Sequence, residues 1–219
     1  SFETNNIIIN DYAQSMDSSE YAEAVNMRNI YEPLIGIPPQ NVIIENDSYI
    51  PLSRDVVGLM NVNVKFGDKQ YDLIFDTGAG MSVVKRSFAE EIGLKMIETS
   101  IDANAATGKV VKTSLAVADS LFISDILVTN CVFLVLEDEA LDFPQANFFP
   151  LGAIGFPVIE EMKEISITRT DTLIVNKQQS SGIESNMRLD GLQPMVYLYN
   201  GIDTLAYSFD TGATTTHFS

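Results

Sequence analysis

The chain has 219 residues, of which 46% are hydrophobic and 20% charged, and its 30 acidic and 13 basic side chains give a formal net charge of −17. This composition fits a globular protein with a real core, and the negative charge disfavours nucleic acids and anionic membranes as partners. A single cysteine, Cys131, and a single histidine, His217, near the end of the chain, are a poor basis for a zinc site or for Ser-His or Cys-His catalysis. We therefore expect no metal and no cofactor, and carboxylates remain as the catalytic groups.

Residues 1–49 are predicted to be an N-terminal helical extension. A helix is expected over 17–31, because Asp17 and Glu20 have the spacing of a capping box and apolar residues recur at helical intervals. The glycine and prolines of 36–39 end it. We interpret this helix as a packing element; the alternative, an inhibitory segment that occludes the site, is less favoured.

Residues 50–176 are predicted to form a mostly β domain. Expected strands cover 62–66, 73–75, 110–117, 126–136, 165–168 and 173–175, with turns at Gly67-Asp68 and Thr107-Gly108. A short helix is expected to begin with a Ser87 and Glu90 capping box and to stop at Gly93. Cys131 is expected to be a buried small hydrophobe. The longest apolar runs are too short to span a membrane, and the first residues lack the features of a signal peptide, so the sequence does not indicate a location.

An internal repeat follows a predicted linker over 177–191. At an offset of 134 residues, 62–79 aligns with 196–213, and the two segments share Phe-Asp-Thr-Gly-Ala. Internal duplication is the simplest explanation. We therefore interpret 192–219 as the start of a second, truncated lobe, in which about 90 residues of the first have no counterpart.

The repeated Asp-Thr-Gly indicates a specific chemistry. The predicted strand over 73–75 would hold Asp76 at the edge of an apolar sheet, and the glycine would allow a tight turn there. Two such carboxylates facing each other share one proton, because like charges so close cannot both ionise. One then activates a water molecule while the other donates a proton to a carbonyl. Asp76 and Asp210 are the candidates for this pair.

These motifs resemble those of the retropepsin-like aspartic proteases. Asp76-Thr77-Gly78-Ala79-Gly80-Met81-Ser82 resembles the active-site loop of that family, and Ala153-Ile154-Gly155 matches its downstream motif of two hydrophobic residues and a glycine. The hairpin tip over 104–109 occupies the place of the flap, but it has no tyrosine. The resemblance implies a mostly β fold, a closed β-barrel lobe with one short helix. It also implies an aspartic-type endopeptidase that hydrolyses peptide bonds in a peptide or protein substrate.

The resemblance also assigns roles to individual residues. Asp76 and Asp210 would be catalytic, while Thr77 and Thr211 would hold the pair by hydrogen bonds across the loops. The remaining site residues are those of the two active-site loops, where the glycines would offer backbone to the substrate, and those of the flap candidate: Gly78, Ala79, Gly212 and Ala213, and Ala106, Thr107 and Gly108. The second copy lacks its downstream motif, so the active unit is either a homodimer that pairs two copies of Asp76 or a chain with the missing part of the second lobe supplied.

Other interpretations remain open. The Asp-Thr-Gly segments taken singly can be ordinary turns, and Gly78-Ala79-Gly80 can be a phosphate-binding nest, although a third glycine is missing. The chain can also be a catalytically silent peptide-binding or scaffolding module with the same fold. The acidic residues Glu137-Asp138-Glu139 are interpreted as solvated surface charge, and His217 as incidental.

Overall fold

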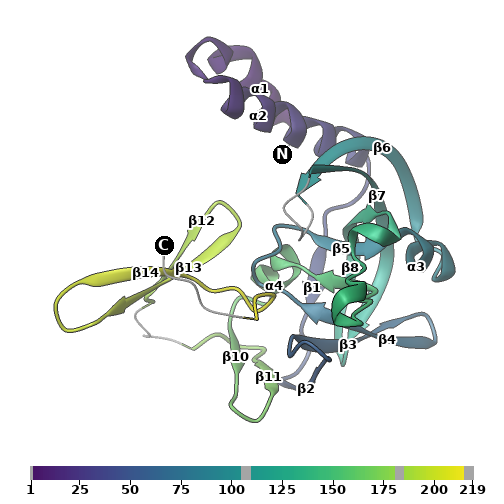
Figure 1. Ribbon diagram of the computed structural model, residues 1–219, viewed down its shortest axis with the longest axis vertical. Coiled ribbons are helices and arrows are strands. Elements are labelled where there is room, and N and C mark those ends of the chain that lie inside the picture. Colours follow the sequence, from purple (N-terminus) through teal and green to yellow (C-terminus); the bar gives the residue numbers. More distant parts are fainter. Residues whose placement is uncertain (1, 105–109, 181–184, 215–219) are drawn as a thin grey trace.

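The structure is a computed structural model that describes residues 2–104, 110–180 and 185–214, and it is mostly β, as predicted (Figure 1). Eleven strands form one continuous sheet: β1 (Asn41–Ile43), β2 (Ser48–Arg54), β3 (Met60–Phe66), β4 (Lys69–Phe75), β5 (Ser82–Lys85), β6 (Lys95–Asn104), β7 (Val110–Ile123), β8 (Ile126–Leu136), β9 (Gly152–Ile154), β10 (Ile165–Ile167) and β11 (Thr172–Val175). A second sheet contains β12 (Met187–Asp190), β13 (Gln193–Tyr199) and β14 (Thr204–Ser208). The α-helices are α1 (Phe2–Tyr12), α2 (Ser18–Tyr31), α3 (Arg86–Glu91) and α4 (Phe156–Glu161).

The main sheet closes on itself. Strands β3, β4, β9, β5, β8 and β7 pair in that order, and β7 pairs back with β3 through Val64 opposite Ile123. The circuit surrounds a core in which the inward side chains of β3, β4 and β8 are fully buried, among them Val64, Leu73, Phe75 and Phe133. Cys131 lies in this core, as predicted, and burial raises its thiol pKa to about 12.

The predicted strands are all present, with small differences in their ends. The turn between β3 and β4 lies at Gly67, as predicted, whereas the turn predicted at Thr107-Gly108 lies outside the described residues. The predicted short helix is α3, which ends before Gly93, but the predicted capping box is wrong. The helix begins at Arg86, and the hydroxyl and N–H of Ser87 donate instead to the carboxylate of Asp138, at 2.5 and 3.1 Å.

Two helices precede the sheet. In α2 the predicted capping box is confirmed: the Asp17 carboxylate accepts from the N–H groups of Ser19 and Glu20, and the Glu20 carboxylate accepts from the N–H of Asp17. Helix α1 was not predicted, because its sequence has no apolar stripe at helical spacing. It packs on α2, where the Asn5 side chain donates to the carbonyl of Ala24 at 2.7 Å. No helix in the described ranges has the length and apolarity needed to cross a membrane.

The C-terminal sheet reproduces the first hairpin of the main sheet. In β3 and β4, Val62 pairs with Leu73; in β13 and β14 the residues 134 positions later, Val196 and Tyr207, pair in the same way. Every pair of the second hairpin has the register of the first, which supports the internal repeat. The first strand of the C-terminal sheet, β12, lies within 177–191, the range predicted to be a linker.

The side chains of the two hairpins differ in how deeply they are buried. Val64 is completely buried in β3, whereas its counterpart Leu198 in β13 is 50% exposed. Figure 1 shows why: β12, β13 and β14 stand apart from the main body, and the segment that follows β14 reaches back to it. The second unit therefore contributes a loop to the main body and little core of its own.

Candidate active site

The first aspartate loop follows β4 directly. The N–H of Asp76 donates to the carbonyl of Ile154 in β9 at 3.0 Å, which fixes the backbone at the end of the strand. One carboxylate oxygen of Asp76 accepts from the N–H groups of Gly78 and Ala79, at 2.9 and 3.1 Å. The loop thus folds around its own carboxylate and orients it.

The downstream motif supports this loop from beneath. Strand β9 lies between β4 and β5, with Ile154 opposite Phe75. The N–H of Gly155 donates to the Ser82 hydroxyl at 3.0 Å, and the next N–H donates to the carbonyl of Ala79 at 2.8 Å. Both ends of the loop are therefore tied to residues about 75 positions later in the chain.

The second loop repeats the geometry of the first. It follows β14, and one carboxylate oxygen of Asp210 accepts from the N–H of Gly212 at 2.8 Å, as Asp76 does from Gly78. Asp76 is half-buried, whereas Asp210 is exposed. The Asp76 carboxylate accepts a second N–H, from Ala79, whereas the N–H of Ala213 donates to the backbone carbonyl of Asp210, so the two carboxylates differ in local support and in access to solvent.

Reciprocal hydrogen bonds join the two loops. The N–H of Thr77 donates to the Thr211 hydroxyl oxygen, and the N–H of Thr211 to that of Thr77, both at 3.0 Å. The Thr77 hydroxyl donates to the carbonyl of Phe209 at 2.7 Å, and the Thr211 hydroxyl to that of Phe75 at 2.5 Å. Both threonines are buried, so these bonds form away from water. Each threonine thus makes the same two hydrogen bonds to the other loop, and the residues that it contacts are equivalent positions of the sequence repeat.

Each glycine of the two loops lies against the aspartate of the other loop. A Cβ atom at Gly78 would lie 2.5 Å from Oδ1 of Asp210, and one at Gly212 would lie 2.5 Å from Oδ1 of Asp76. No real Cβ comes so close, so only glycine permits this approach. The structure thereby brings Asp76 and Asp210, the two aspartates singled out by the sequence, to one place.

The environment of Asp76 favours its protonated form. Its pKa is raised from 3.8 to about 6, first because burial penalises the ionised carboxylate and next because the charge of Asp210 is close. The hydrogen bonds from Gly78 and Ala79 act in the opposite direction but do not cancel these effects. Below about pH 6, Asp76 therefore holds a proton beside another carboxylate.

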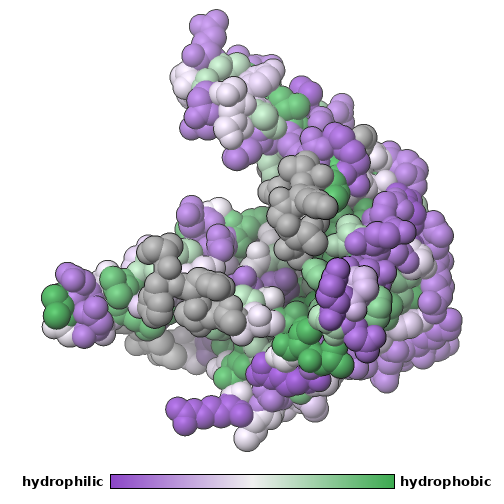
Figure 2. Space-filling model, in the orientation of Figure 1, coloured by the Kyte–Doolittle hydropathy of each residue, from purple (hydrophilic) through white to green (hydrophobic). Residues whose placement is uncertain are grey.

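A cavity of about 910 Å³ opens beside the two aspartates. Its floor is formed by both loops, including Gly78, Ala79, Gly212 and Ala213, and its walls are largely apolar. Part of the wall comes from the turn before β3 and from the segment between β8 and β9, and the rest from the strands β4, β5, β8 and β9. The residues of the turn and the segment include Val57, Leu59, Leu141, Phe143, Phe148 and Pro150. Figure 2 shows the hollow on this face of the molecule. A space of this size and lining suits an organic ligand with apolar side chains.

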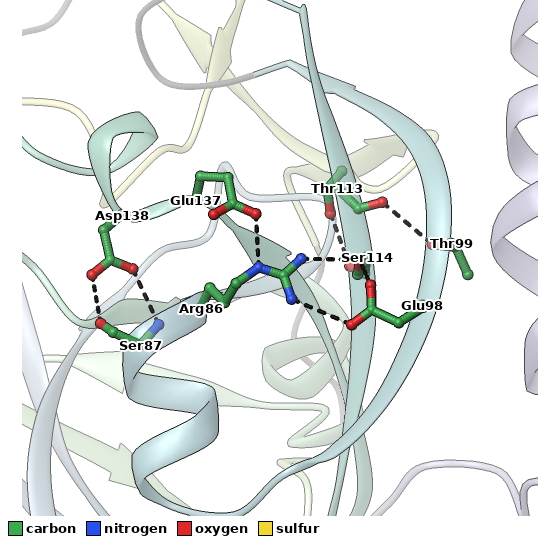
Figure 3. A network of polar contacts seen from close by, with 8 residues as sticks. All are labelled: Arg86, Ser87, Glu98, Thr99, Thr113, Ser114, Glu137 and Asp138. Carbon is green, nitrogen blue, oxygen red and sulfur yellow. Dashed lines mark hydrogen bonds and ion pairs between the residues drawn. The ribbon is translucent and has the colours of Figure 1, made fainter.

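Three consecutive residues hold the segment that forms this wall. Lys85, with a side chain only 8% exposed, forms an ion pair with Asp142. Arg86 donates to Glu137 at 2.7 Å, and Ser87 binds Asp138 (Figure 3). Glu137, with a side chain 62% exposed, and Glu139 lie at the surface, in agreement with their interpretation as solvated surface charge, but Glu137 and the half-buried Asp138 are also bonded to this triplet.

Arg86 also connects the wall to the hairpin of β6 and β7. Its guanidinium group contacts Glu98 at 3.3 Å and the Ser114 hydroxyl at 3.2 Å, on the side opposite Glu137 (Figure 3). Neither Arg86 nor the wall residues Leu141, Phe143 and Phe148 were predicted from the sequence. The only sequence signal for these wall residues was an apolar run close to two aromatic residues, and such a run indicates a buried core segment equally well.

The remaining predicted site residues are not tested by this geometry. The flap candidates Ala106, Thr107 and Gly108, and His217, lie outside the described residues. Within the described ranges, no three side chains of His, Cys, Asp or Glu are grouped in a way that could hold a metal ion.

The comparison with protein families agrees with the motifs. Residues 62–155 match a family model described as aspartyl protease. Among solved structures, the chain is similar to the crystal structure of a retropepsin-like aspartic protease from Rickettsia conorii, with 20% identity and a TM-score of 0.41, over 63% of this chain and 93% of that one. A search of curated proteins found no match. The matched residues include the Asp76-Thr77-Gly78 loop and the Gly155 motif beneath it, so this part of the chain is similar to the aspartyl protease family.

Proposed function

We propose that this protein is an aspartic endopeptidase in which Asp76 and Asp210 form the catalytic pair. The observation that carries the proposal is the reciprocal contact of Thr77 and Thr211, which sets two carboxylates of one chain against each other. A module that only binds peptides has no need of two facing carboxylates, one of which has a raised pKa. In this account residues 50–176 form one lobe, and β12 to β14 with the second loop begin another.

The chemistry follows from one shared proton. Asp76 holds the proton, because its pKa is raised, and Asp210 acts as the base. Asp210 takes a proton from a water molecule whose oxygen attacks the carbonyl carbon of the peptide bond, while Asp76 gives its proton to the carbonyl oxygen. The tetrahedral diol then collapses: the C–N bond breaks, the nitrogen receives a proton from Asp210, and a hydroxyl proton returns to Asp76. The products are a carboxylic acid and an amine.

The cavity supports a peptide as the substrate. Its apolar walls, with Leu141 and Phe148 on one side, can receive a large apolar side chain next to the bond that is cleaved. Gly78 and Gly212 line the cavity, and because their N–H groups already donate to Asp76 and Asp210, it is their carbonyl oxygens that can accept hydrogen bonds from an extended peptide. The substrate class is therefore peptides or proteins, with apolar residues near the cleavage site.

The first test is the loss of either carboxylate. Asp76→Asn and Asp210→Asn should each lower kcat for a peptide library at pH 3–7 by about 10³-fold or more, because neither variant has both an acid and a base. Asp68→Asn makes the same change at an exposed turn and should leave kcat unchanged. Cleavage that persists in Asp76→Asn would refute the mechanism. If the native protein binds the peptides without cleaving them, the silent binding module is correct instead.

The threonine contact can be tested by a matched pair of variants. Thr77→Val keeps the shape of the side chain but removes the hydroxyl, so the N–H of Thr211 and the carbonyl of Phe209 lose their partners in a buried place. The free energy of unfolding should fall by about 1–3 kcal/mol, and kcat should fall as well. Thr77→Ser keeps the hydroxyl and should therefore keep most of the native free energy of unfolding and most of kcat. Equal losses in the two variants, in chemical denaturation and peptide assays, would contradict the role of the hydroxyl.

The raised pKa of Asp76 predicts a dependence of stability on pH. The folded protein keeps a proton on Asp76 up to about pH 6, whereas an unfolded chain releases it near 3.8. The stabilisation from this proton is complete below pH 3.8 and is lost as the pH rises to about 6. We expect the free energy of unfolding of the native protein to fall relative to Asp76→Asn over that interval. Parallel curves for the two proteins would contradict the pKa shift.

A further inference from the structure

Strand β6 is at the edge of the main sheet. It ends the strand order, and its pairing with β7 is interrupted between Ile97 and Ile101. Beyond this irregularity the strand continues through Asp102 towards the end of the β6–β7 hairpin. On its inner side this outer part of β6 pairs again with β7, with Asp102 opposite Lys112. On its outer side its backbone groups have no neighbouring strand and are open to other contacts.

Helix α2 supplies such a contact through the side-chain amide of Asn26. Its Nδ2 donates to the carbonyl of Asp102 at 2.7 Å, and its Oδ1 accepts from the N–H of the same residue at 3.1 Å. A primary amide offers one donor and one acceptor side by side, as the backbone of a neighbouring strand would. Asn26 therefore closes the free edge of β6 at Asp102.

An apolar cluster beneath this contact reaches the active-site loop. Ile30 of α2, Ile101 of β6 and Leu115 of β7 are buried together, and Met27 and Met81 pack against them. Met81 belongs to the loop that begins with Asp76. Figure 1 shows α2 lying beside β6 over this part of the sheet. The helix, the hairpin and the catalytic loop thus share one set of side-chain contacts.

We propose that α2 is a brace for the β6–β7 hairpin and that Asn26 is a positioning residue, which fixes the outer part of β6 relative to the loop of Asp76. In its effect on catalysis the proposal rests on the proposed function. The helix is then neither a passive extension nor an inhibitor that fills the cleft: no residue of α1 or α2 lines the described cavity beside the aspartates. The N-terminal segment acts from outside the cleft, through the apolar cluster that reaches Met81 of the Asp76 loop.

Hydrogen exchange tests the brace without any need for activity. Asn26→Ala removes both bonds to Asp102, and exchange of the Asp102 amide, measured by NMR, should become about 3- to 10-fold faster. Asn29→Ala makes the same change on the same helix, where the side chain has no hydrogen bond with the described part of the chain, and should leave Asp102 unchanged. Equal exchange in Asn26→Ala and the native protein would overturn the proposal.

Peptide kinetics test the link to the site. The apolar cluster joins β6 to the loop of Asp76, whose Gly78 and Ala79 line the cavity. Because a displaced β6 disturbs this floor without changing the two carboxyls, Asn26→Ala should raise KM by about 3- to 10-fold and change kcat by less than about twofold. Asn29→Ala should match the native enzyme. Faster exchange at Asp102 with an unchanged KM would overturn the positioning role. If the native protein cleaves no peptide, the proposed function fails, and the exchange experiment still decides whether α2 is a brace.

Discussion

The hydrogen bonds between Thr77 and Thr211 are the interaction on which the site depends. They are the contacts that bring a loop of the main body and a loop of the C-terminal sheet into register, and both threonines are buried. Because the two loops are copies, the bonds that Thr77 makes to the second loop have their equivalents in the bonds that Thr211 makes to the first. The same contact that joins the two units therefore also sets the carboxylates of Asp76 and Asp210 against each other.

The rest of the fold holds this contact in place from several sides. Strand β9 ties down the first loop through Ile154 and Gly155. On one flank, Lys85 and Arg86 fix the acidic segment that carries the apolar wall of the cavity. On another flank, α2 fixes the β6–β7 hairpin. The contact between Thr77 and Thr211 is thus surrounded by elements that are held in place by residues far apart in the sequence.

The parts predictable from the sequence are those whose signal is local. The repeat, the β3–β4 hairpin and the two Asp-Thr-Gly loops could be predicted, because turn residues and apolar alternation lie within short windows. Contacts over long separations could not be predicted. Ser87 has the spacing of a helix cap, yet Asp138, 51 residues later, takes its hydroxyl and N–H. Asn26 and Asp102 are separated by 76 residues, and nothing near either one indicates the pairing.

The most direct test of the account is the pKa of Asp76 itself. In an NMR titration of the side-chain carboxyl carbons, we expect Asp76 of the native protein to titrate near pH 6. In Asp210→Asn the pKa should be lower, because the neighbouring charge is gone, and still above the ordinary value, because burial remains. A native Asp76 that titrates near its ordinary value of 3.8, or one that is unaffected by Asp210→Asn, would contradict the proposal that the two carboxylates act as a pair.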